Sequence, residues 1–400
     1  MRIAQIAPLA EAVPPKRYGG TERVVSYLTE ELVRQGHDVT LFASGDSRTS
    51  ARLVPCCPTA LRLDETVNDP VPYTLMMLDR VRGCADQFDI LHFHIELEHF
   101  PIFQDIAPRT VTTLHGRLDA NELSPFYSRF SQFPLVSISD DQRRPMPPVN
   151  WAGTVYHGLP LDLLPFSPAA DDGYLAFLGR IAPEKRPDRA IRIAQQSGVP
   201  LRIAAKVADQ DRKYFEEHIR PLFDDPLIEF VDEIGDSAKG KFLGRARALL
   251  FPIDWPEPFG LVMIEAMACG TPVIAYPEGS VPEIIDKTTG FLVNNTDEAV
   301  QAVGRLHELD RAAIRNRFEE RFSARRMAHD YVEIYRRLAE GSRANTDITI
   351  QEQANGHSKP DSRFPTTRQT AFRQSGGAGT AESPSRATLQ GQGRRQRPTQ

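Results

Sequence analysis

The stretch ALLFPIDWPEPFGLVMIEAMACGTPVIA, residues 248–275, places apolar runs on both sides of a polar, proline-bearing loop. The pattern predicts a buried strand, a loop, a helix over Leu261–Cys269 and a second buried strand. The helix is apolar on nearly every side, which is typical of a helix buried within a domain. A strand–helix–strand unit of this kind indicates a parallel sheet with helices on both of its faces.

Two carboxylates and the start of that helix predict a ligand site. Glu265 lies inside the apolar helix, where an ionised carboxylate is costly unless another group pairs with it. Glu257 lies in the loop before the helix, and the free amides at the helix start, from Phe259, Gly260 and Leu261, attract an anion. A sugar–phosphate–ribose ligand would fit this order of groups. The alternative is that Glu265 only caps a neighbouring loop.

A basic loop forms the second cluster, GRIAPEKRPDR at residues 179–189. Arg180 directly follows an expected strand, Tyr174–Leu178, and Lys185 comes five residues later. Two cations beside a helix start would bind a diphosphate, since unit charges ~4 Å apart attract by about 4 kcal/mol at an effective dielectric of ~20. The alternative is a solvated basic loop.

The N-terminal half carries two weaker signals. Gly19 and Gly20 precede an expected helix at Thr21–Gln35, and glycine allows a backbone to approach a ligand closely. They do not form a dinucleotide fingerprint, and an ordinary tight turn is the alternative. His115 ends an expected strand, Thr110–Leu114, and should point into the same crevice as the other motifs; a structural histidine is the alternative.

The alternation of strands and helices extends outward over two halves of the chain. The expected strands of the first sheet are Ile3–Ala7, Val39–Ala43, Ile90–Phe93, Thr110–Leu114, Leu135–Ile138 and Thr154–Tyr156. Those of the second are Tyr174–Leu178, Leu201–Ala205, Ile228–Val231, Ala246–Pro252 and Pro272–Ala275. We therefore predict an α/β fold of two facing, doubly wound Rossmann-like domains, residues 1–160 and 174–340, with a linker at 161–173. A helix over Ala324–Leu338 should close the second domain.

Charge and composition separate a tail from the rest of the chain. Residues 341–400 contain nine Lys and Arg against four Asp and Glu, whereas the whole chain carries a net charge of −5. The tail has few apolar residues and cannot offset its ordering entropy, so we predict that 341–400 is disordered. The net negative charge excludes a globally basic nucleic-acid binder. Weak anchoring of the tail to anionic lipid or nucleic acid stays open.

The cysteines and the lengths of the apolar runs indicate the cellular compartment of the protein. The four cysteines form no C-x-x-C pair and no disulfide framework, which is typical of a reducing cytosol. No apolar run approaches the ~18 residues that a membrane span needs. The opening MRIAQIAPLAEA is better interpreted as a first strand than as a signal peptide. We expect a cytoplasmic protein, with peripheral membrane contact left open.

Together these motifs resemble the retaining glycosyltransferases of family 4, which have the GT-B architecture. The resemblance covers about residues 1–340, and Glu257-x7-Glu265 carries it most specifically, followed by the Gly179-Arg180…Lys185 loop. Gly19-Gly20 and the run Thr113-Leu114-His115-Gly116 match in order and depth. The opening also resembles a branch known from oligosaccharide-antibiotic biosynthesis, which does not identify an acceptor.

The resemblance implies catalytic roles for four residues. Arg180 and Lys185 would bind the donor diphosphate and stabilise the leaving group. Glu257 would hold sugar hydroxyls, and His115 would orient the sugar near the reacting carbon. The implied substrate-binding positions, with the ribose on Glu265 and the N-terminal loop closing over the phosphates, are Gly19, Gly20, Phe259, Gly260, Leu261 and Glu265.

The implied activity is transfer of a hexose from a UDP- or GDP-linked sugar to a hydroxyl of a saccharide, lipid or small-molecule acceptor. Transfer would retain the anomeric configuration, with the leaving phosphate as base and no metal, other cofactor or nucleic-acid partner. After Leu201–Ala205 the chain reads AKVADQD where many relatives carry a glycine-bearing loop, so the base is not identified. The alternatives are a nucleotide-sugar epimerase or phosphorylase of the same architecture and a non-catalytic nucleotide-sugar-binding relative. A dehydrogenase is disfavoured because the nicotinamide fingerprint is missing.

Two further runs have the spacing of metal-binding patterns. Asp209-Gln210-Asp211 spells D-x-D, but it precedes a charged helix and we interpret it as a solvated helix start. In HFHIELEH, residues 92–99, alternate side chains on one strand face offer a metal site as one alternative. We favour a strand end that lines the acceptor cleft.

Overall fold

The apolar segments of the first half of the chain pair into a seven-stranded parallel sheet in the order β3-β2-β1-β4-β5-β6-β7. The structure, a computed structural model, describes residues 1–16, 19–170 and 173–355, with side chains described as far as residue 341. The strands are β1 (Arg2–Ile6), β2 (Asp38–Ser44), β3 (Arg52–Cys57), β4 (Ile90–Phe93), β5 (Thr110–Thr113), β6 (Leu135–Ser137) and β7 (Trp151–Thr154). β1 lies near the centre, bonded to β2 and β4.

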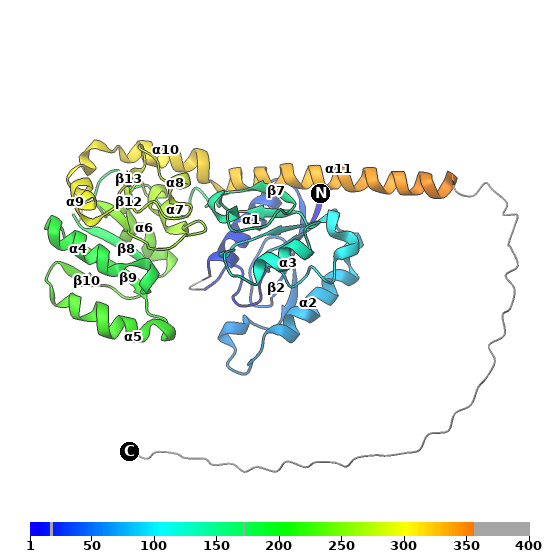
Figure 1. The fold of residues 1–400 in the computed structure, drawn as a ribbon, viewed down its shortest axis with the longest axis horizontal. Coiled ribbons are helices and arrows are strands. Elements are labelled where there is room, and N and C mark those ends of the chain that lie inside the picture. Colours follow the sequence, from blue (N-terminus) through cyan, green and yellow to red (C-terminus); the bar gives the residue numbers. More distant parts are fainter. Residues whose placement is uncertain (17–18, 171–172, 356–400) are drawn as a thin grey trace, which may run out of the picture. The chain divides into compact units, whose positions relative to one another are not determined.

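Helices cover both faces of this first sheet, as Figure 1 shows. They are α1 (Gly20–Arg34), α2 (Val71–Gly83) and α3 (Leu123–Arg129). Residues an odd number of positions apart on a strand point to opposite faces. Ile3 of β1 accordingly packs in the same cluster as Leu28 of α1, whereas Ile6 packs with Leu78 of α2. This double burial explains why β1 is apolar without alternation.

The second sheet has six parallel strands in the order β10-β9-β8-β11-β12-β13. They are β8 (Leu175–Arg180), β9 (Leu201–Lys206), β10 (Ile228–Phe230), β11 (Ala248–Phe251), β12 (Val273–Ala275) and β13 (Gly290–Leu292). The helices after the linker are α4 (Pro187–Ser197), α5 (Arg212–Tyr214), α6 (Asp236–Gly244), α7 (Leu261–Ala268), α8 (Val281–Ile284), α9 (Thr296–Gly304), α10 (Arg311–Phe322) and α11 (Ala324–Asn355). α7 is the buried helix that the opening stretch of sequence predicts, with Met263 to Ala268 all buried.

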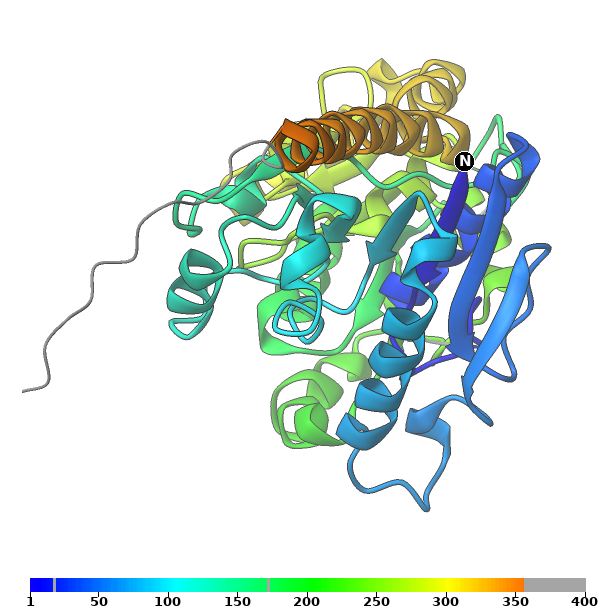
Figure 2. The same ribbon diagram turned by 90° about the vertical axis from the view of Figure 1, so that its right-hand side faces the viewer.

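Helix α11 returns from the second lobe to the first (Figure 1). The hydroxyl of Tyr335 contacts His92 Nδ1 of β4 at 2.7 Å, and that of Tyr331 contacts Thr113 Oγ1 of β5 at 2.8 Å. Figure 2 shows the start of β1 beside this helix. Near the end of the same strand, Gln5 Nε2 donates to the Tyr335 hydroxyl at 3.2 Å. The sequence predicts a helix that closes the second domain, but its buried tyrosines are bonded to the first sheet.

The structure departs from the sequence prediction at the last strand of the first sheet, at the unexpected strands β3 and β13, and at the end of helix α11. The last strand of the first sheet is Trp151–Thr154, so the predicted strand at Thr154–Tyr156 is wrong beyond its first residue. Val155 is apolar because it is buried in the core, not because it is a strand residue. Helix α11 also continues past residue 341, where the sequence predicts the tail to begin, and the rest of that tail lies outside the described residues. The domain limits 1–160 and 174–340 stay a prediction.

Candidate functional site

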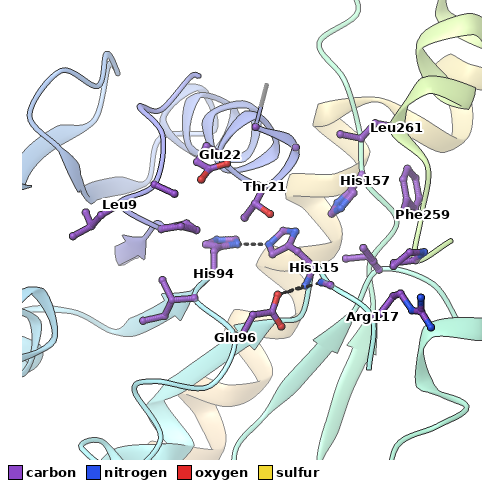
Figure 3. A pocket seen from close by; sticks show the side chains of 18 of the residues that line it. Leu9, Thr21, Glu22, His94, Glu96, His115, Arg117, His157, Phe259 and Leu261 are labelled. Carbon is purple, nitrogen blue, oxygen red and sulfur yellow. Dashed lines mark hydrogen bonds between the residues drawn. The ribbon is translucent and has the colours of Figure 1, made fainter. Parts of the chain in front are cut away.

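Loops from the carboxyl ends of both sheets enclose a cavity of about 790 Å³, the main cavity. The first lobe supplies the loops after β1, β4 and β5, and the second supplies the loop after β11 and the start of α7 (Figure 3). Its lining includes seven predicted site residues: Gly19, Gly20, His115, Glu257, Phe259, Gly260 and Leu261. The structure therefore brings these residues together around one cavity, and their functional roles stay a prediction.

A second, smaller cavity of about 160 Å³ adjoins the main one. The two share Gly19, Gly20 and Leu261 in their linings, so the first glycine loop lies over both. Glu265 of α7 lines the second cavity and not the main one. Glu257 and Glu265 thus face adjoining spaces on either side of the start of α7.

Glycine is required at the start of α7. Gly260 adopts a left-handed φ of 79°, and a Cβ there would meet the Met263 side chain at 2.8 Å. The loop before it is held by Ser280, whose N–H donates to the Glu257 carbonyl at 3.0 Å and whose hydroxyl donates to the Phe259 carbonyl at 3.0 Å. The loop therefore has a fixed backbone path into the helix.

Glu257 is paired within this loop. Its Oε2 accepts from Lys185 Nζ and, at 3.0 Å, from Trp255 Nε1. The Lys185 ammonium also lies 4.4 Å from the centre of the Trp255 ring, a cation–π contact. Lys185 is therefore held against the wall of the main cavity by Glu257 and Trp255.

Arg180 is further from the cavities than the sequence predicts. Its Nη2 donates to Glu184 at 2.5 Å, and its Nε lies 3.2 Å from Asp211 Oδ2 without the geometry of a hydrogen bond. Neither Arg180 nor Lys185 lines either cavity, so the expectation that both cations reach one pocket with the two glutamates is not met by these side-chain positions. The cause is local, because Glu184 of the same loop pairs with Arg180 and Glu257 of the loop before α7 pairs with Lys185.

Asp211 also corrects the interpretation of the D-x-D run. Its side chain is buried, not solvated, because it pairs with Arg180 beneath the loop. Within the parts of the chain that the structure describes, no group of three or more His, Cys, Asp or Glu is arranged to hold a metal. His94, Glu96 and Glu98 of the run 92–99 instead line the main cavity, the position favoured by the sequence analysis.

Glu265 belongs to an ion-pair cluster that joins the lobes. Its carboxylate accepts from Lys239 Nζ of α6 at 2.8 Å, and Lys239 lies 3.3 Å from Asp236. Asp236 in turn pairs with Arg23 of α1, on the other lobe. The partner that a buried Glu265 needs is therefore Lys239, and the alternative that it merely caps a loop does not describe these contacts. The sequence analysis missed Arg23 and Lys239 because pairing between distant segments leaves no local pattern.

His115 is a partly exposed histidine that contacts two buried histidines beside the main cavity. Its Nε2 lies 2.9 Å from His94 Nδ1, and its ring stacks on that of His157 with centroids 5.4 Å apart (Figure 3). Burial lowers the pKa of His115 to about 3 and the pKa values of His94 and His157 well below their ordinary range. These rings are therefore neutral at pH 7.

Glu96 is a site residue to which the sequence analysis gave no role beyond lining the cleft. Its backbone has a left-handed φ of 59°, a strained conformation for a non-glycine residue. Its Oε1 accepts from the N–H groups of His115 and Gly116, at 2.9 and 3.2 Å (Figure 3). Burial nevertheless raises the pKa of Glu96 to about 7. The loop thus places a carboxyl that titrates near neutrality in the wall of the main cavity.

Replacing Glu96 with Gln should change how stability depends on pH. The folded-state pKa of about 7 lies above the ordinary 4.5, so the contribution of Glu96 to stability is full below pH 4.5 and is lost as the pH rises through 7. We expect Glu96→Gln to gain roughly 1–3 kcal/mol of unfolding free energy, relative to the unchanged protein, between pH 4.5 and pH 8. Urea unfolding at both pH values measures this gain, and an equal difference at the two would contradict it.

Within residues 1–16, 19–170 and 173–355, no helix is long and apolar enough to cross a membrane.

Comparison with known proteins assigns both lobes. The profile described as "Glycosyltransferase Family 4" matches residues 18–144, and that described as "Glycosyl transferases group 1" matches residues 165–323. The D-inositol 3-phosphate glycosyltransferase of Mycobacterium tuberculosis is 34% identical over 173 residues, which are 40% of this chain and 34% of that protein. The chain thus aligns with about a third of the length of this curated relative.

Solved structures share the fold at lower identity. AviGT4, a glycosyltransferase involved in avilamycin A biosynthesis, has a TM-score of 0.67 and 23% identity, covering 85% of this chain and 98% of its own. Sucrose-phosphate synthase from Thermosynechococcus elongatus has a TM-score of 0.68 and 19% identity over 85% of this chain and 99% of its own. Anabaena Alr3699/HepE, solved in complex with UDP-glucose, has a TM-score of 0.61 and 17% identity over 86% and 100%. These likenesses identify the fold as GT-B.

Proposed function

The chain belongs to the group 1 glycosyltransferases of family 4, and from this premise we propose that it transfers a sugar from a nucleoside diphosphate sugar to an acceptor hydroxyl. One observation carries the proposal. Glu257 and Glu265 face two adjoining cavities on either side of the start of α7, and the Gly19-Gly20 loop lies over both. A ligand with hydroxyls at both ends and a diphosphate between them fits this arrangement.

The nucleoside end of the donor is assigned to the second cavity. Glu265 pairs with Lys239 through one oxygen, Oε1, which leaves Oε2 as an acceptor for ribose hydroxyls. The base would lie toward the loops after β9 and β10, at Lys206 and Ile234. A UDP- or GDP-linked donor is proposed, and the Anabaena structure with bound UDP-glucose supports the former class.

The diphosphate is assigned to the space between the cavities. Amides at the start of α7 and the close backbone of Gly20, whose added Cβ would lie 3.9 Å from Leu261, would receive phosphate oxygens. Arg180 and Lys185 would exchange their carboxylate partners, Glu184 and Glu257, for the phosphates. The sugar would then lie in the main cavity, between Glu257 and His115.

The chemistry follows from where charge develops. Bond breaking at the anomeric carbon is oxocarbenium-like and loads negative charge onto the departing diphosphate, where preformed cations and helix amides stabilise it most. In the proposed retaining route the leaving phosphate oxygen accepts the proton of the acceptor hydroxyl, and no metal takes part. Exclusion of water by the closed loops would suppress hydrolysis of the donor.

Product analysis with labelled UDP- and GDP-sugars tests the proposal. Transfer of label to an added saccharide, lipid or small-molecule hydroxyl, with the anomeric configuration retained, supports it. An epimerase would change the sugar without any acceptor, a phosphorylase would require inorganic phosphate, and a non-catalytic relative would bind donor and leave it intact. Any of these three results replaces the proposal.

Glu265→Gln should weaken binding of the free nucleoside diphosphate by about 10-fold or more, since a hydrogen bond to a charged group is worth about 1.5–3 kcal/mol. Calorimetry measures the change. Lys239→Gln is the matched control because it breaks the same ion pair but leaves the carboxylate in place. Equal weakening in both variants would mean that the ion pair, not the ribose contact, accounts for the loss.

A further inference from the structure

A continuous row of hydrogen bonds, buried except for the partly buried contact at His115, connects helix α11 with the main cavity. Its members come from β1, β4, β5 and α11 and the loops that follow these strands. The contacts in order are His115 Nε2 to His94 Nδ1 (2.9 Å), His94 Nε2 to Gln5 Oε1 (2.8 Å), Gln5 Nε2 to Tyr335 Oη (3.2 Å), Tyr335 Oη to His92 Nδ1 (2.7 Å) and His92 Nε2 to Thr113 Oγ1 (2.7 Å). We call these residues the histidine row.

The imidazoles of the histidine row are neutral. Burial lowers the pKa values of His92 and His94 well below their ordinary range, as it does for His115. A neutral imidazole has one N–H donor and one bare acceptor nitrogen. His92 and His94 use both nitrogens in the row, so each must donate on one side and accept on the other.

Because of this constraint, the hydrogen bonds of the histidine row can all be donated in one of two directions along the row. The amide of Gln5 selects one of them. Its Oε1 faces His94 and can only accept, so His94 carries its proton on Nε2. His94 Nδ1 must then accept from His115 Nε2–H. On the other side, Gln5 donates to Tyr335, whose hydroxyl donates to His92. The opposite direction would require the oxygen and nitrogen of Gln5 to change places.

The surroundings of His115 Nδ1 favour the same direction independently. Nδ1 is buried and has no hydrogen-bond partner among the described residues. A buried N–H without a partner is rarer in proteins than an acceptor with an unused lone pair. If the proton of His115 is on Nε2, that N–H donates to His94, and Nδ1 carries only a lone pair. Hydrogen bonds that run in one direction through a low-dielectric core also reinforce one another.

We propose that Gln5, His94 and Tyr335 are positioning residues that hold His115 as the Nε2–H tautomer. In this tautomer His115 donates its one N–H to His94, and its buried Nδ1 carries a lone pair. Resting on the proposed function, the histidine row fixes the orientation of the His115 ring, which lines the main cavity beside the transferred sugar. Because Tyr335 lies on α11, docking of this helix against the first sheet becomes a condition for the correct tautomer.

Nitrogen NMR of histidine-labelled protein without substrate tests the tautomer directly. The chemical shifts of the two ring nitrogens identify which one carries the proton, and a His115→Gln sample assigns the signal. We expect His115 and His94 to be Nε2–H. An Nδ1–H tautomer at His115 would overturn the inference. Because the spectrum needs no substrate, this result is independent of whether the protein transfers a sugar.

Tyr335→Phe breaks the row at α11 and tests its consequence. Gln5 can then turn, so we expect the His115 signal to shift toward a mixture of tautomers and kcat/KM for transfer to fall about 5- to 50-fold. Tyr127→Phe is the matched control: Tyr127 is also fully buried, but its hydroxyl has no hydrogen-bond partner in the described structure. An unchanged His115 signal in Tyr335→Phe, or the same kinetic loss in Tyr127→Phe, would contradict the positioning role.

Discussion

Replacing Arg180 with Ala is expected to lower kcat for sugar transfer by about 10²–10³, the cost of removing one preformed group from a developing anion. The guanidinium extends from the end of β8 and is held by Glu184 and by Asp211 beneath the loop. A departing diphosphate carries more negative charge than either carboxylate, so Arg180 should bind it most strongly in the transition state. The effect should therefore appear in kcat at saturating donor, more than in the Kd for the donor.

Glu184→Gln is the control for this prediction. It removes the hydrogen-bonded carboxylate partner of Arg180 and keeps the cation, with Asp211 still beside it. We expect kcat to change by less than about 3-fold, because this ion pair is partly exposed and surface ion pairs contribute only about 0–1 kcal/mol. A normal kcat in Arg180→Ala would remove Arg180 from the catalytic machinery. A matching loss in Glu184→Gln would assign the effect to the shape of the loop.

The second lobe shows how much of the fold the sequence can predict. Pro187 and Gly198 are typical of the first position of a helix and of the residue after its end, and they predict a helix over Pro187–Ser197, which is α4 in the structure. The buried helix α7 differs from its prediction by one residue. Both have strong signals, a proline at the first helical position or a run of apolar residues between strands. β3 at Arg52–Cys57 was not predicted, since it is a half-buried edge strand that contains Pro55.

Some residues of the candidate site could likewise be predicted from the sequence, and others could not. Motifs within one loop, such as Glu257 and the start of α7, were predicted because their chemistry is contained in a few neighbouring residues. Arg23, Lys239 and the histidine row were missed because each contact joins segments far apart in the chain, and no local pattern records such a pairing. The strained φ of Glu96 was likewise invisible, since it follows from the loop path and not from the residue type.

Gly279→Ala is expected to displace the loop that carries Glu257. Gly279 has a left-handed φ of 60°, and an added Cβ would lie 2.4 Å from the backbone nitrogen of Glu257 and 2.5 Å from its carbonyl oxygen. The left-handed conformation alone costs an alanine about 1–2 kcal/mol. The backbone collision adds to this cost, so we expect a loss of roughly 3–5 kcal/mol in unfolding free energy. The loop that carries Glu257 must also move, and a displacement near 1 Å can lower kcat about 10²-fold.

Gly198→Ala is the control that separates the cost of the left-handed conformation from the cost of the backbone collision. Gly198 follows α4 with a left-handed φ of 66°, but a Cβ there meets nothing within 4 Å. It should therefore lose only the conformational part, about 1–2 kcal/mol, and keep its kcat. Urea unfolding and single-donor kinetics on both variants distinguish the terms. Equal stability losses in the two variants would show that the contact with Glu257 does not contribute to stability. A destabilised Gly279→Ala with normal kcat would show that catalysis tolerates displacement of the loop that carries Glu257, so that the fixed path of this loop is structural.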